Sequence, residues 1–320
     1  MSKPEILVTD RFIPVVLDGL NSAFVTHELW KADDPEAVLS SVAGNIRGIA
    51  AGHTIPFNAD FIDRFPNLEI IANFGVGYDN IDAAYAATRN ILVTNTPDVL
   101  TEEVADTAIG LMIMTARELS ASERWLRAGN WNGPYPLTRG TLRGKKLGIF
   151  GLGRIGKAIA RRAEAMLMEV SYHNRNPLAD VDYRYFATLT ELAAHCDVLL
   201  CAAPGGPATR HIINTDIFKA LGPEGMFINI GRGSTVDETA LIEALQNETI
   251  MTAGLDVFEF EPKVPQALID MDHVVLLPHV ASASQHTRDA MGQLQVDNLT
   301  HWFKNGAPIT PVAETPWPRS

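Results

Sequence analysis

Short apolar runs, separated by polar segments compatible with helices, recur along the N-terminal part of the chain. Continuous apolar runs of this length are typical of strands that are buried on both faces. Their alternation with helices predicts a parallel sheet with helices on each side. This part of the chain is therefore expected to form an α/β domain. The predicted strands are Ile6–Val8, Gly48–Ala51, Ile70–Ala72 and Leu92–Val93, and the predicted helices include 35–42 and 59–65.

A longer apolar pattern begins at Thr101. A threonine start, two early acids and apolar residues almost all round predict a buried helix over 101–117, which joins two domains. Segment 124–131 and the turn-rich segment 132–144 then form an arm with exposed aromatic residues. Exposed apolar surface of this kind favours a contact between subunits, although a loop lying on its own domain would show the same pattern.

Strands and helices alternate again from Lys145 onward. Several of the later apolar runs end in loops that contain glycine or proline. The pattern predicts a second doubly wound parallel sheet, in which such loops lie at the carboxyl edge, where ligands bind. The predicted strands are 147–150, 170–172, 197–203, 227–230, 252–258 and 274–277, with helices ending at 166 and covering 238–245 and 288–305.

Composition excludes several classes of partner. The 320 residues, 46% of them hydrophobic, are enough for two domains with sizeable cores. Lys and Arg number 26 against 38 Asp and Glu, so the net charge of −12 opposes nucleic acid or an anionic membrane as the main partner. The sequence has no leader-like apolar region and no stretch long enough to span a bilayer, so we expect a cytoplasmic protein.

The two cysteines bracket a predicted strand. Cys196 and Cys201 lie at opposite parity, so their side chains are expected on opposite faces of the sheet. They are predicted to be buried reduced thiols, neither a disulfide nor a metal pair. The spacing of the histidines predicts no metal site.

The chemistry of the chain centres on a glycine pattern, Gly151-Leu152-Gly153-Arg154-Ile155-Gly156. The pattern follows a predicted strand, opens a predicted helix and is followed by a second strand, which is the context of a dinucleotide site. The first glycine permits a tight turn, the second lets backbone approach a pyrophosphate, and the third lets the helix pack on the strand. The alternative is a tight strand-to-helix connection without a ligand.

Two further loops at strand ends are candidates for holding a substrate anion. Segment 74–78 follows the third apolar run, and the backbone N–H groups of Val76 and Gly77 are expected to take one carboxylate oxygen. Gly52, at the end of the second run, is assigned to the same site. The alternative is that Gly75 and Gly77 serve only a tight turn.

Three successive strands deliver Arg232, Glu261 and His279 to one edge of the predicted sheet. A cation, a carboxylate and an imidazole therefore converge at this edge: the Arg232 guanidinium can pair with a carboxylate, and the His279 imidazole can donate a proton near neutral pH. Glu261 would orient the imidazole and stabilise its charged form. Taken singly, the three residues also fit a surface ion pair, a solvated acid and a core histidine, but their convergence at one edge favours catalysis.

The chain resembles the D-isomer-specific 2-hydroxyacid dehydrogenases over nearly its whole length, most closely the glyoxylate/hydroxypyruvate reductases. The resemblance implies a Rossmann cofactor domain at 99–288 inserted in a flavodoxin-like catalytic domain made of 1–98 and 289–320, with a cleft between them. It also implies a homodimer built through the helix and arm at 101–144. The motifs that carry the resemblance, in the family's order, are 73–82, Gly151–Gly156, Asn229–Gly233, Gly254–Phe258, Glu261–Pro262 and Leu277–Ser282.

The chain departs from the family at two positions. Leu167 stands where a glycine usually precedes the second strand of the cofactor domain, which leaves the C-cap geometry of the helix open. No acid occupies the ribose position. Asp256 is expected either to support the catalytic residues or to be a structural acid. With the resemblance we also assign to cofactor binding Thr101, Ala203, Pro204, Thr209, Ile230 and Asp256.

The end of the second strand of this domain predicts the identity of the cofactor. NAD-specific sites place Asp or Glu there, about 20 residues beyond the glycines, where the acid repels a 2′-phosphate. Asn174 occupies this position without a charge, Arg175 supplies a cation for a phosphate, and Asn176 follows. We therefore predict a preference for NADPH. An Arg175 that stacks on adenine would instead leave NADH as the cofactor.

The predicted function is reduction of a small 2-oxo acid, such as glyoxylate or hydroxypyruvate, to the D-2-hydroxy acid. One alternative is another D-2-hydroxyacid dehydrogenase, acting on pyruvate or phenylpyruvate. A second is a dinucleotide-sensing binding protein on the same fold. A formate-type dehydrogenase fits less well, because formate oxidation releases no proton to an imidazole.

Overall fold

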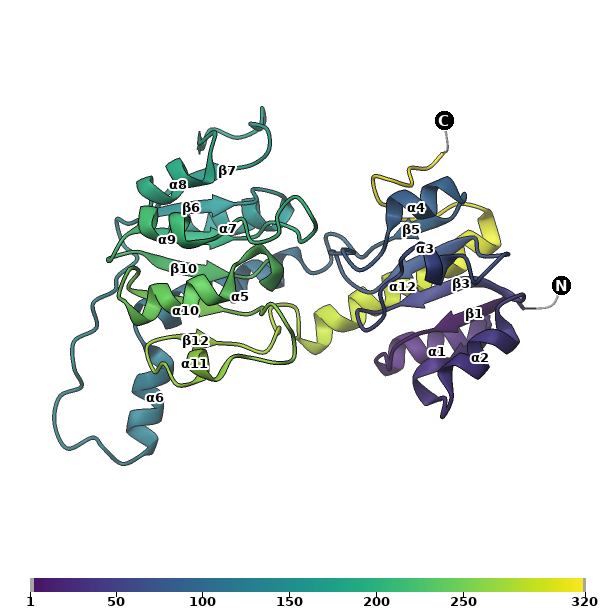
Figure 1. The fold of residues 1–320 in the computed structure, drawn as a ribbon, viewed down its shortest axis with the longest axis horizontal. Coiled ribbons are helices and arrows are strands. Elements are labelled where there is room, and N and C mark those ends of the chain that lie inside the picture. Colours follow the sequence, from purple (N-terminus) through teal and green to yellow (C-terminus); the bar gives the residue numbers. More distant parts are fainter. Residues whose placement is uncertain (1–2, 319–320) are drawn as a thin grey trace. The chain divides into compact units, whose positions relative to one another are not determined.

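The chain folds into two compact α/β units, and the computed structural model describes residues 3–318 (Figure 1). Unit 1 consists of residues 1–100 and 284–320, and unit 2 of residues 101–283. The boundaries fall at the starts of two helices, whereas the sequence prediction put them at 98/99 and 288/289. Each unit has one parallel sheet and its own helices, which confirms the predicted fold class.

Unit 1 is built on a five-stranded sheet with the order β2-β1-β3-β4-β5, in which every neighbouring pair is parallel. In this flavodoxin-like order the winding direction of the chain reverses between β1 and β3. Ligands bind outside the carboxyl ends of strands near such a switch point, so the loops after β1, β3 and β4 form the candidate site of this unit. The strands are β1 Glu5–Val8, β2 Val25–Glu28, β3 Ile46–Ala51, β4 Ile70–Asn73 and β5 Leu92–Thr94.

Helix α12, from the C-terminal part of the chain, packs with α1 and on β3 and β4 (yellow in Figure 1). Its buried Gln295 donates to the carbonyl oxygens of Ala51 (3.1 Å) and Ala72 (2.8 Å), so distant parts of the sequence share one core. Residues of α2, α3 and α4 enclose a second apolar cluster with the sheet. The helices are α1 Pro14–Ala23, α2 Pro35–Val42, α3 Ala59–Ile62, α4 Ala83–Thr88 and α12 Gln285–Asn305, with a 3-10 turn at Leu29–Lys31.

Unit 2 is built on a seven-stranded parallel sheet with the order β12-β11-β10-β9-β6-β7-β8. Its first strand, β6, lies between β7 and β9; Leu147 of β6 pairs with Val170 on one side and Val198 on the other. The switch point of this sheet therefore falls between β6 and β9. The strands are β6 Lys146–Phe150, β7 Glu169–His173, β8 Arg184–Tyr185, β9 Val198–Cys201, β10 Met226–Asn229, β11 Thr252–Leu255 and β12 Val275–Leu276.

Two groups of helices cover this sheet. Helix α5 packs against α7, β10 and β11, whereas α8, α9 and α10 form a second group. The second group encloses an apolar cluster that includes Phe218 and Phe227, whose ring centres lie 5.5 Å apart. The helices are α5 Thr101–Ala116, α7 Arg154–Ala165, α8 Leu189–His195, α9 Thr215–Leu221, α10 Glu238–Gln246 and α11 Gln266–Ile269, with a 3-10 turn at Gly233–Thr235.

Both cysteines are buried free thiols, as predicted. Burial raises the pKa of Cys196 to about 12 and also raises the pKa of Cys201. The prediction that they lie on opposite faces of the sheet is wrong, because both belong to the apolar cluster beneath α8, α9 and α10. Strand parity does not apply to Cys196, since this residue ends helix α8 and strand β9 begins only at Val198.

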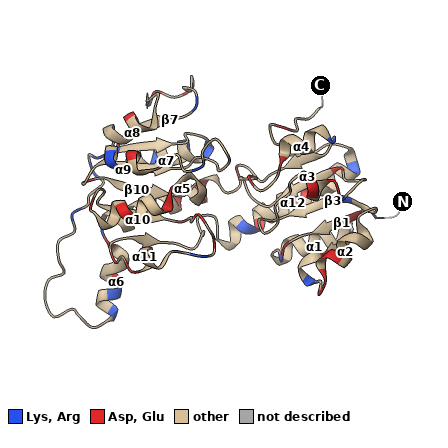
Figure 2. Ribbon diagram, in the orientation of Figure 1, with Lys and Arg blue, Asp and Glu red and all other residues tan. Residues whose placement is uncertain are grey.

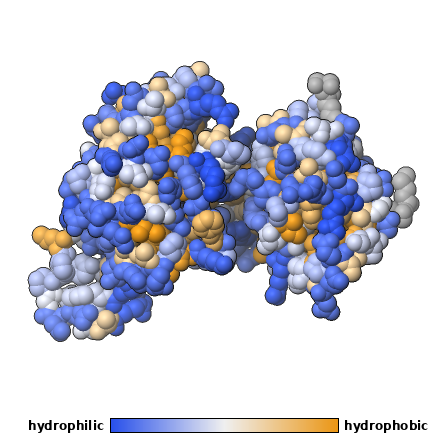
Figure 3. All heavy atoms as spheres, in the orientation of Figure 1, coloured by the Kyte–Doolittle hydropathy of each residue, from blue (hydrophilic) through white to orange (hydrophobic). Residues whose placement is uncertain are grey.

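An arm leaves unit 2 after α5. It consists of α6, Leu119–Arg127, and the irregular segment 128–144. Trp125 and Tyr135 pack edge to face with ring centres 5.3 Å apart, whereas Trp131 and Leu137 are 71% and 98% exposed. Apolar atoms are accordingly visible on the surface of the arm (Figure 3).

Acidic and basic residues are interspersed over both units (Figure 2). Ion pairs join neighbouring elements, as between Arg162 of α7 and Asp106 of α5 at 2.7 Å. Between residues 3 and 318, no helix is long and apolar enough to cross a membrane. The same part of the chain contains no group of three or more His, Cys, Asp or Glu side chains arranged to hold a metal ion.

Candidate active site

The glycine turn between β6 and α7 has the shape of a dinucleotide cradle. Gly151 adopts a φ of +99°, and a Cβ atom there would lie 2.6 Å from the backbone nitrogen of Ala203, across the switch point. A Cβ on Gly156 would lie 2.5 Å from the Gly151 carbonyl oxygen, so this glycine lets α7 approach the turn. The Cβ position of Gly153, in contrast, has no heavy atom within 4 Å beyond its chain neighbours. The turn therefore fits a pyrophosphate placed against the N-terminus of α7.

A side chain ties the end of β7 to this turn. Asn174 accepts a hydrogen bond at Oδ1 from the backbone N–H of Leu152 at 2.7 Å. This structural role was missed from the sequence, which suggested only a cofactor contact for Asn174. Arg175 and Asn176 are exposed beyond it. A cation beside an uncharged amide suits a 2′-phosphate better than an NAD ribose, which needs a carboxylate acceptor.

Other residues assigned to the cofactor lie in loops at the carboxyl edge of the same sheet. Ala203 and Pro204 follow β9, and Ile230 follows β10. Thr209 closes the loop after β9 by donating to the Pro204 carbonyl oxygen at 2.8 Å. Their contacts with a cofactor stay predictions. Three further assigned residues are at the N-termini of helices: Thr101 in α5, and Arg154 and Ile155 in α7.

His279 and Glu261 form a hydrogen-bonded pair at this edge. His279 Nδ1 lies 2.7 Å from Glu261 Oε2, and Glu261 Oε1 accepts from the backbone N–H of Phe258 at 2.9 Å. Burial opposes ionisation of Glu261. The hydrogen bonds from His279 and Phe258, together with the charges of His279 and Arg232, outweigh burial and hold the pKa of Glu261 below its ordinary value. Because Glu261 engages Nδ1, the opposite ring nitrogen, Nε2, points away from the carboxylate.

Arg232 stands at a tight corner between β10 and a short 3-10 turn. Asn229 fixes this corner by donating from Nδ2 to the Arg232 carbonyl oxygen at 3.1 Å. A Cβ on Gly233 would overlap the Phe258 carbonyl group, at 1.9 Å, so the glycine lets the corner lie directly against the loop that leads to Glu261. The charge of Arg232 is accordingly close enough to act on Glu261. The structure thus brings together the three residues predicted to be catalytic.

Asp256 supports the turn that presents His279. Its side chain is buried, with the residue 1% exposed, and its oxygens accept from the backbone N–H groups of Val280 (2.7 Å) and Ala281 (2.9 Å). The Asp256 carbonyl oxygen accepts from the N–H of His279 at 2.8 Å, and His279 adopts a φ of +52°. Burial raises the pKa of Asp256, although the two backbone hydrogen bonds oppose the rise. Asp256 therefore supports the turn that carries His279, and its contact with a cofactor stays a prediction.

In unit 1, the loop after β4 presents backbone donors. Gly75 adopts a φ of +144°, and a Cβ there would lie 3.0 Å from His53 Nε2. The carbonyl groups of Gly75, Val76 and Gly77 accept hydrogen bonds within the unit, whereas the N–H groups of Val76 and Gly77 donate to none of residues 3–318. These are the two donors that the sequence assigned to a carboxylate, an assignment that stays a prediction.

Gly52, assigned to the same anion, has a different environment. Its N–H faces Thr9 Oγ1 and Asp10 Oδ2, both at 3.2 Å, and its carbonyl oxygen accepts from Asn80 Nδ2 at 3.0 Å. A Cβ at this position would lie 2.3 Å from the Asp10 carboxyl carbon, which explains the glycine on structural grounds. A contact between Gly52 and a substrate stays a prediction.

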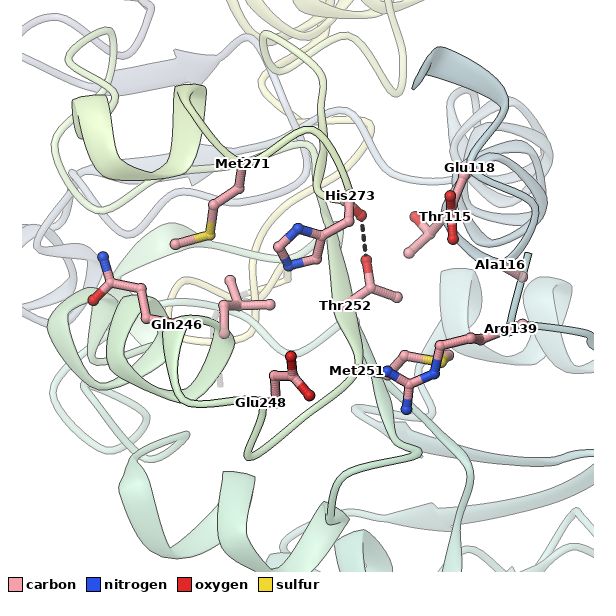
Figure 4. Close-up of a pocket in the computed structure, with 12 residues that line it drawn as sticks. Thr115, Ala116, Glu118, Arg139, Gln246, Glu248, Met251, Thr252, Met271 and His273 are labelled. Carbon is pink, nitrogen blue, oxygen red and sulfur yellow. Dashed lines mark hydrogen bonds between the residues drawn. The ribbon is translucent and has the colours of Figure 1, made fainter. Parts of the chain in front are cut away.

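A cavity of about 320 Å³ lies at the opposite edge of the unit 2 sheet. Figure 4 shows it lined by Glu118 after α5, Arg139 of the arm, Thr252 at the start of β11, and His273, which precedes β12 by two residues. A hydrogen bond from Thr252 Oγ1 to the His273 carbonyl oxygen closes one side. The pair formed by His279 and Glu261 follows the carboxyl ends of these strands, so this cavity is separate from the candidate active site.

A doubly wound sheet with a glycine cradle at its switch point, and with a His–Glu pair and an arginine at neighbouring strand ends, defines a dinucleotide-dependent oxidoreductase that moves a proton as well as a hydride. Residues 109–281 match the NAD binding domain of the D-isomer specific 2-hydroxyacid dehydrogenases. The chain belongs to this family, as its motifs indicated.

Similar proteins extend over nearly the whole chain. A glyoxylate/hydroxypyruvate reductase of Arabidopsis thaliana is 44% identical over 294 residues, which cover 92% of this chain and 94% of that protein. A 2-ketogluconate reductase of Gluconobacter oxydans is 41% identical, with 97% and 99% covered. The crystal structure of an NADPH-dependent glyoxylate/hydroxypyruvate reductase of Sinorhizobium meliloti in complex with NADP and malonate has a TM-score of 0.93 at 50% identity, covering 100% of this chain and 99% of that one.

Proposed function

We propose that this protein is an NADPH-dependent reductase that converts glyoxylate to glycolate and hydroxypyruvate to the D-2-hydroxy acid. Two similar proteins, 44% and 50% identical over nearly the full chain, are glyoxylate/hydroxypyruvate reductases. The observation in this chain that carries the proposal is the 2.7 Å contact between His279 and Glu261 near the Arg232 corner. His279 would serve as the proton donor, and Arg232 as the cation that binds a carboxylate.

The reaction adds a hydride to the carbonyl carbon and a proton to the carbonyl oxygen, so the C=O double bond becomes a C–O single bond and new C–H and O–H bonds form. Reduced nicotinamide, when bound, supplies the hydride. Protonated His279 gives its Nε2 proton to the oxygen, while ionised Glu261 holds the ring at Nδ1 and stabilises its charged form. Arg232 pairs with the substrate carboxylate through its forked guanidinium. In unit 1, the N–H groups of Val76 and Gly77 are proposed as donors to a substrate carboxylate.

NADPH is the preferred cofactor in this proposal, and NADH is a weaker one. Arg175 pairs with the 2′-phosphate, and Asn174 places no negative charge beside it. A charge-assisted contact of about 1.5–3 kcal/mol corresponds to roughly 10- to 150-fold in affinity. The preference should weaken at high salt, because the contact is exposed.

Steady-state kinetics with glyoxylate, hydroxypyruvate, pyruvate, phenylpyruvate and 2-ketogluconate test the proposal. We expect the highest kcat/KM for the first two acids, and a preference for NADPH over NADH of roughly 10- to 150-fold. Arg175→Ala should remove most of this preference, whereas Arg184→Ala, at an exposed arginine of nearby β8, should retain it. Comparable kcat/KM for both cofactors would refute the cofactor proposal alone. No turnover of any acid would refute the reductase and favour a dinucleotide-binding role.

We also propose a cytosolic homodimer joined through α5 and the arm. The exposed Trp131 and Leu137 support a subunit contact, since side chains of this kind gain stability when a partner covers them. The two buried reduced thiols support a reducing compartment.

A further inference from the structure

Two side-chain amides donate hydrogen bonds to the backbone carbonyl groups of the loop after β4. Asn73, the last residue of β4, donates from Nδ2 to the carbonyl oxygens of Gly75 (3.1 Å) and Gly77 (3.0 Å). Asn95, which follows β5, donates from Nδ2 to the carbonyl oxygen of Val76 at 2.9 Å. Each of the three consecutive carbonyl groups therefore has a fixed donor from a neighbouring strand end.

Fixing a carbonyl group also fixes the N–H group of the next residue. A peptide unit is planar and trans, so its C=O and N–H groups point in opposite directions. The Gly75 carbonyl shares a peptide unit with the Val76 N–H, and the Val76 carbonyl shares one with the Gly77 N–H. Asn73 thus sets the direction of the Val76 donor together with the backbone N–H of Thr96, which also donates to the Gly75 carbonyl oxygen, at 3.0 Å. Asn95 sets the direction of the Gly77 donor.

We propose that Asn73 and Asn95 are positioning residues of the substrate-carboxylate site, whose amides turn two peptide units so that the N–H groups of Val76 and Gly77 face the carboxylate. This inference rests on the proposed function, which assigns those two N–H groups to the substrate. Both asparagines act through the backbone and touch no reacting atom. Donors that are already oriented need no rearrangement when the anion binds.

The environment of Asn73 fits this role. The residue is 1% exposed, and its Oδ1 atom accepts no hydrogen bond from residues 3–318. A buried amide with an unpaired oxygen is unfavourable compared with an aliphatic side chain of similar size. An uncharged NH₂ group, however, is the donor that can serve two carbonyl groups at once, as Gly75 and Gly77 require. The unpaired Oδ1 atom of Asn73 therefore accompanies an NH₂ group whose two N–H donors hold the loop.

Asn95 is held in place by the C-terminal part of unit 1. Its N–H donates to the Thr310 carbonyl oxygen at 3.2 Å, and its carbonyl oxygen accepts from Thr310 Oγ1 at 2.6 Å. Thr310 is bound in turn by buried Asn298 of α12, which accepts from the Thr310 N–H at 3.0 Å and donates to Thr310 Oγ1 at 2.9 Å. A continuous set of hydrogen bonds therefore runs from α12 to the peptide unit of Val76 and Gly77, and it keeps the amide of Asn95 in register.

Two substitutions of Asn95 test the role, because this residue is less buried than Asn73. Asn95→Ala removes the donor, and Asn95→Asp keeps the shape but places an acceptor against the Val76 carbonyl. The carboxylate is held alike in the ground and transition states, so losing a donor should raise KM and leave kcat nearly unchanged. We expect the KM for glyoxylate to rise about 10-fold or more in both variants, with the KM for NADPH and the unfolding midpoint close to those of the unchanged protein.

Asn67→Ala is the matched control. Exposed Asn67 also braces a carbonyl group of unit 1, that of Gly44 at 2.7 Å, but lies before β4, at the other edge of the sheet. This variant should keep the glyoxylate KM of the unchanged protein. An unchanged KM in folded Asn95→Ala would overturn the inference. A fall in kcat and in unfolding midpoint without a rise in KM would also overturn it, since that result marks a purely structural residue.

Calorimetric binding of malonate in the presence of NADPH provides a measurement that needs no turnover. Weaker malonate binding by Asn95→Ala than by Asn67→Ala supports the positioning role, and equal affinities overturn it. Because this comparison measures anion binding alone, it stands even if the panel of 2-oxo acids disproves the proposed reductase. The two failures are therefore distinguishable.

Discussion

At the scale of single residues, the contact with Glu261 orients the imidazole of His279 for the acid–base role proposed above. Both carboxylate oxygens have partners, at 2.7 Å from His279 and 2.9 Å from the Phe258 N–H. The carboxylate therefore stays ionised beside the ring at neutral pH, and the ring is held in one orientation. An imidazole that is already oriented can donate a proton from Nε2 without a prior rearrangement of the side chain.

Replacing His279 by Ala should remove this proton transfer. We expect kcat for glyoxylate reduction to fall by about 10²–10⁴-fold, because a positioned general acid contributes that much. The dissociation constant of NADPH, measured by fluorescence titration, should change little. His273→Ala, at the separate cavity on the other edge of the sheet, serves as the control. Turnover by His279→Ala equal to that of the unchanged protein would exclude His279 as the donor.

Glu261 should also make a pH-dependent contribution to stability. Burial raises the pKa of Glu261, but the hydrogen bonds with His279 and with the Phe258 N–H outweigh burial. The pKa of Glu261 in the folded protein therefore lies below its ordinary value of 4.5. A carboxyl group of this kind stabilises the folded state above its ordinary pKa and loses that contribution as pH falls through the lower, folded-state value. The unfolding free energy lost in Glu261→Gln should thus be largest near neutral pH and shrink in acid. Denaturant unfolding at a series of pH values measures it, and a loss that grows toward acid pH would contradict the assignment.

The convergence of the three residues proposed to be catalytic was predictable, because each of them lies at the end of a strand. Arg232, Glu261 and His279 each follow an apolar run, and parallel strands bring such positions to one edge. The supporting groups were not predictable in the same way. Asn73 and Asn95 act on carbonyl groups whose directions depend on the folded loop, and Glu261 is bonded to a backbone N–H that no side-chain pattern reveals.

At the scale of elements, helix α7 ends in a complete Schellman motif that has a leucine at its left-handed position. The Met168 N–H donates to the Ala163 carbonyl oxygen at 3.0 Å and the Leu167 N–H to that of Glu164 at 2.9 Å. Leu167 adopts a φ of +63° and is 67% exposed. The departure from the family's glycine therefore leaves the cap geometry intact and places a side chain in a strained backbone conformation.

Leu167→Gly should accordingly stabilise the protein. Relief of left-handed strain is worth about 1–2 kcal/mol, and the greater freedom of glycine in the unfolded chain offsets part of it, so the net gain should be roughly 0.5–1 kcal/mol. Ala165→Gly, at an exposed position of the same last turn with helical backbone, should instead lose up to about 1 kcal/mol. Calorimetric unfolding midpoints compare the two. A lower midpoint for Leu167→Gly would show that its side chain contributes packing.

The strands that were not predicted from the sequence are edge strands. Strand β2 has the sequence Val-Thr-His-Glu without a fully buried residue, and β8 has only Arg184 and Tyr185. An edge strand faces solvent and needs no continuous apolar run, so the signal that located the central strands is absent. Helix α12 likewise begins before the predicted Arg288, because Ser284 caps it by accepting from the Thr287 N–H at 3.2 Å.

At the scale of the whole molecule, the arm should decide the state of assembly. Trp131 and Leu137 are 71% and 98% exposed, and a symmetric interface would bury each of them twice. Burial of such a side chain is worth about 1.5–3 kcal/mol. The double variant Trp131→Asp, Leu137→Asp should therefore be monomeric at micromolar concentration, where we expect the unchanged protein to be the proposed dimer.

Analytical ultracentrifugation makes this comparison directly. Ile269→Asp, at an exposed apolar residue of unit 2 outside the arm, should remain dimeric and controls for added charge. A monomeric unchanged protein would contradict the proposed dimer. A dimeric double variant would show that the subunits meet elsewhere. The sequence predicted this arm through its aromatic residues, but the packing of Trp125 on Tyr135 and the exposure of Trp131 depend on the folded loop.

Unit 1 is assembled from two stretches of sequence between which the whole of unit 2 is inserted. During synthesis, residues 1–100 leave the ribosome while the side of β3 and β4 that α12 later covers is still bare. At about 5–20 residues per second, roughly 10–40 s pass before that helix is made. Unit 2 is formed by one continuous stretch of sequence, so it can fold before α12 is made. The nascent chain should thus contain a folded unit 2 and a five-stranded sheet that still lacks α12. A chaperone that binds exposed apolar surface would therefore bind the first hundred residues.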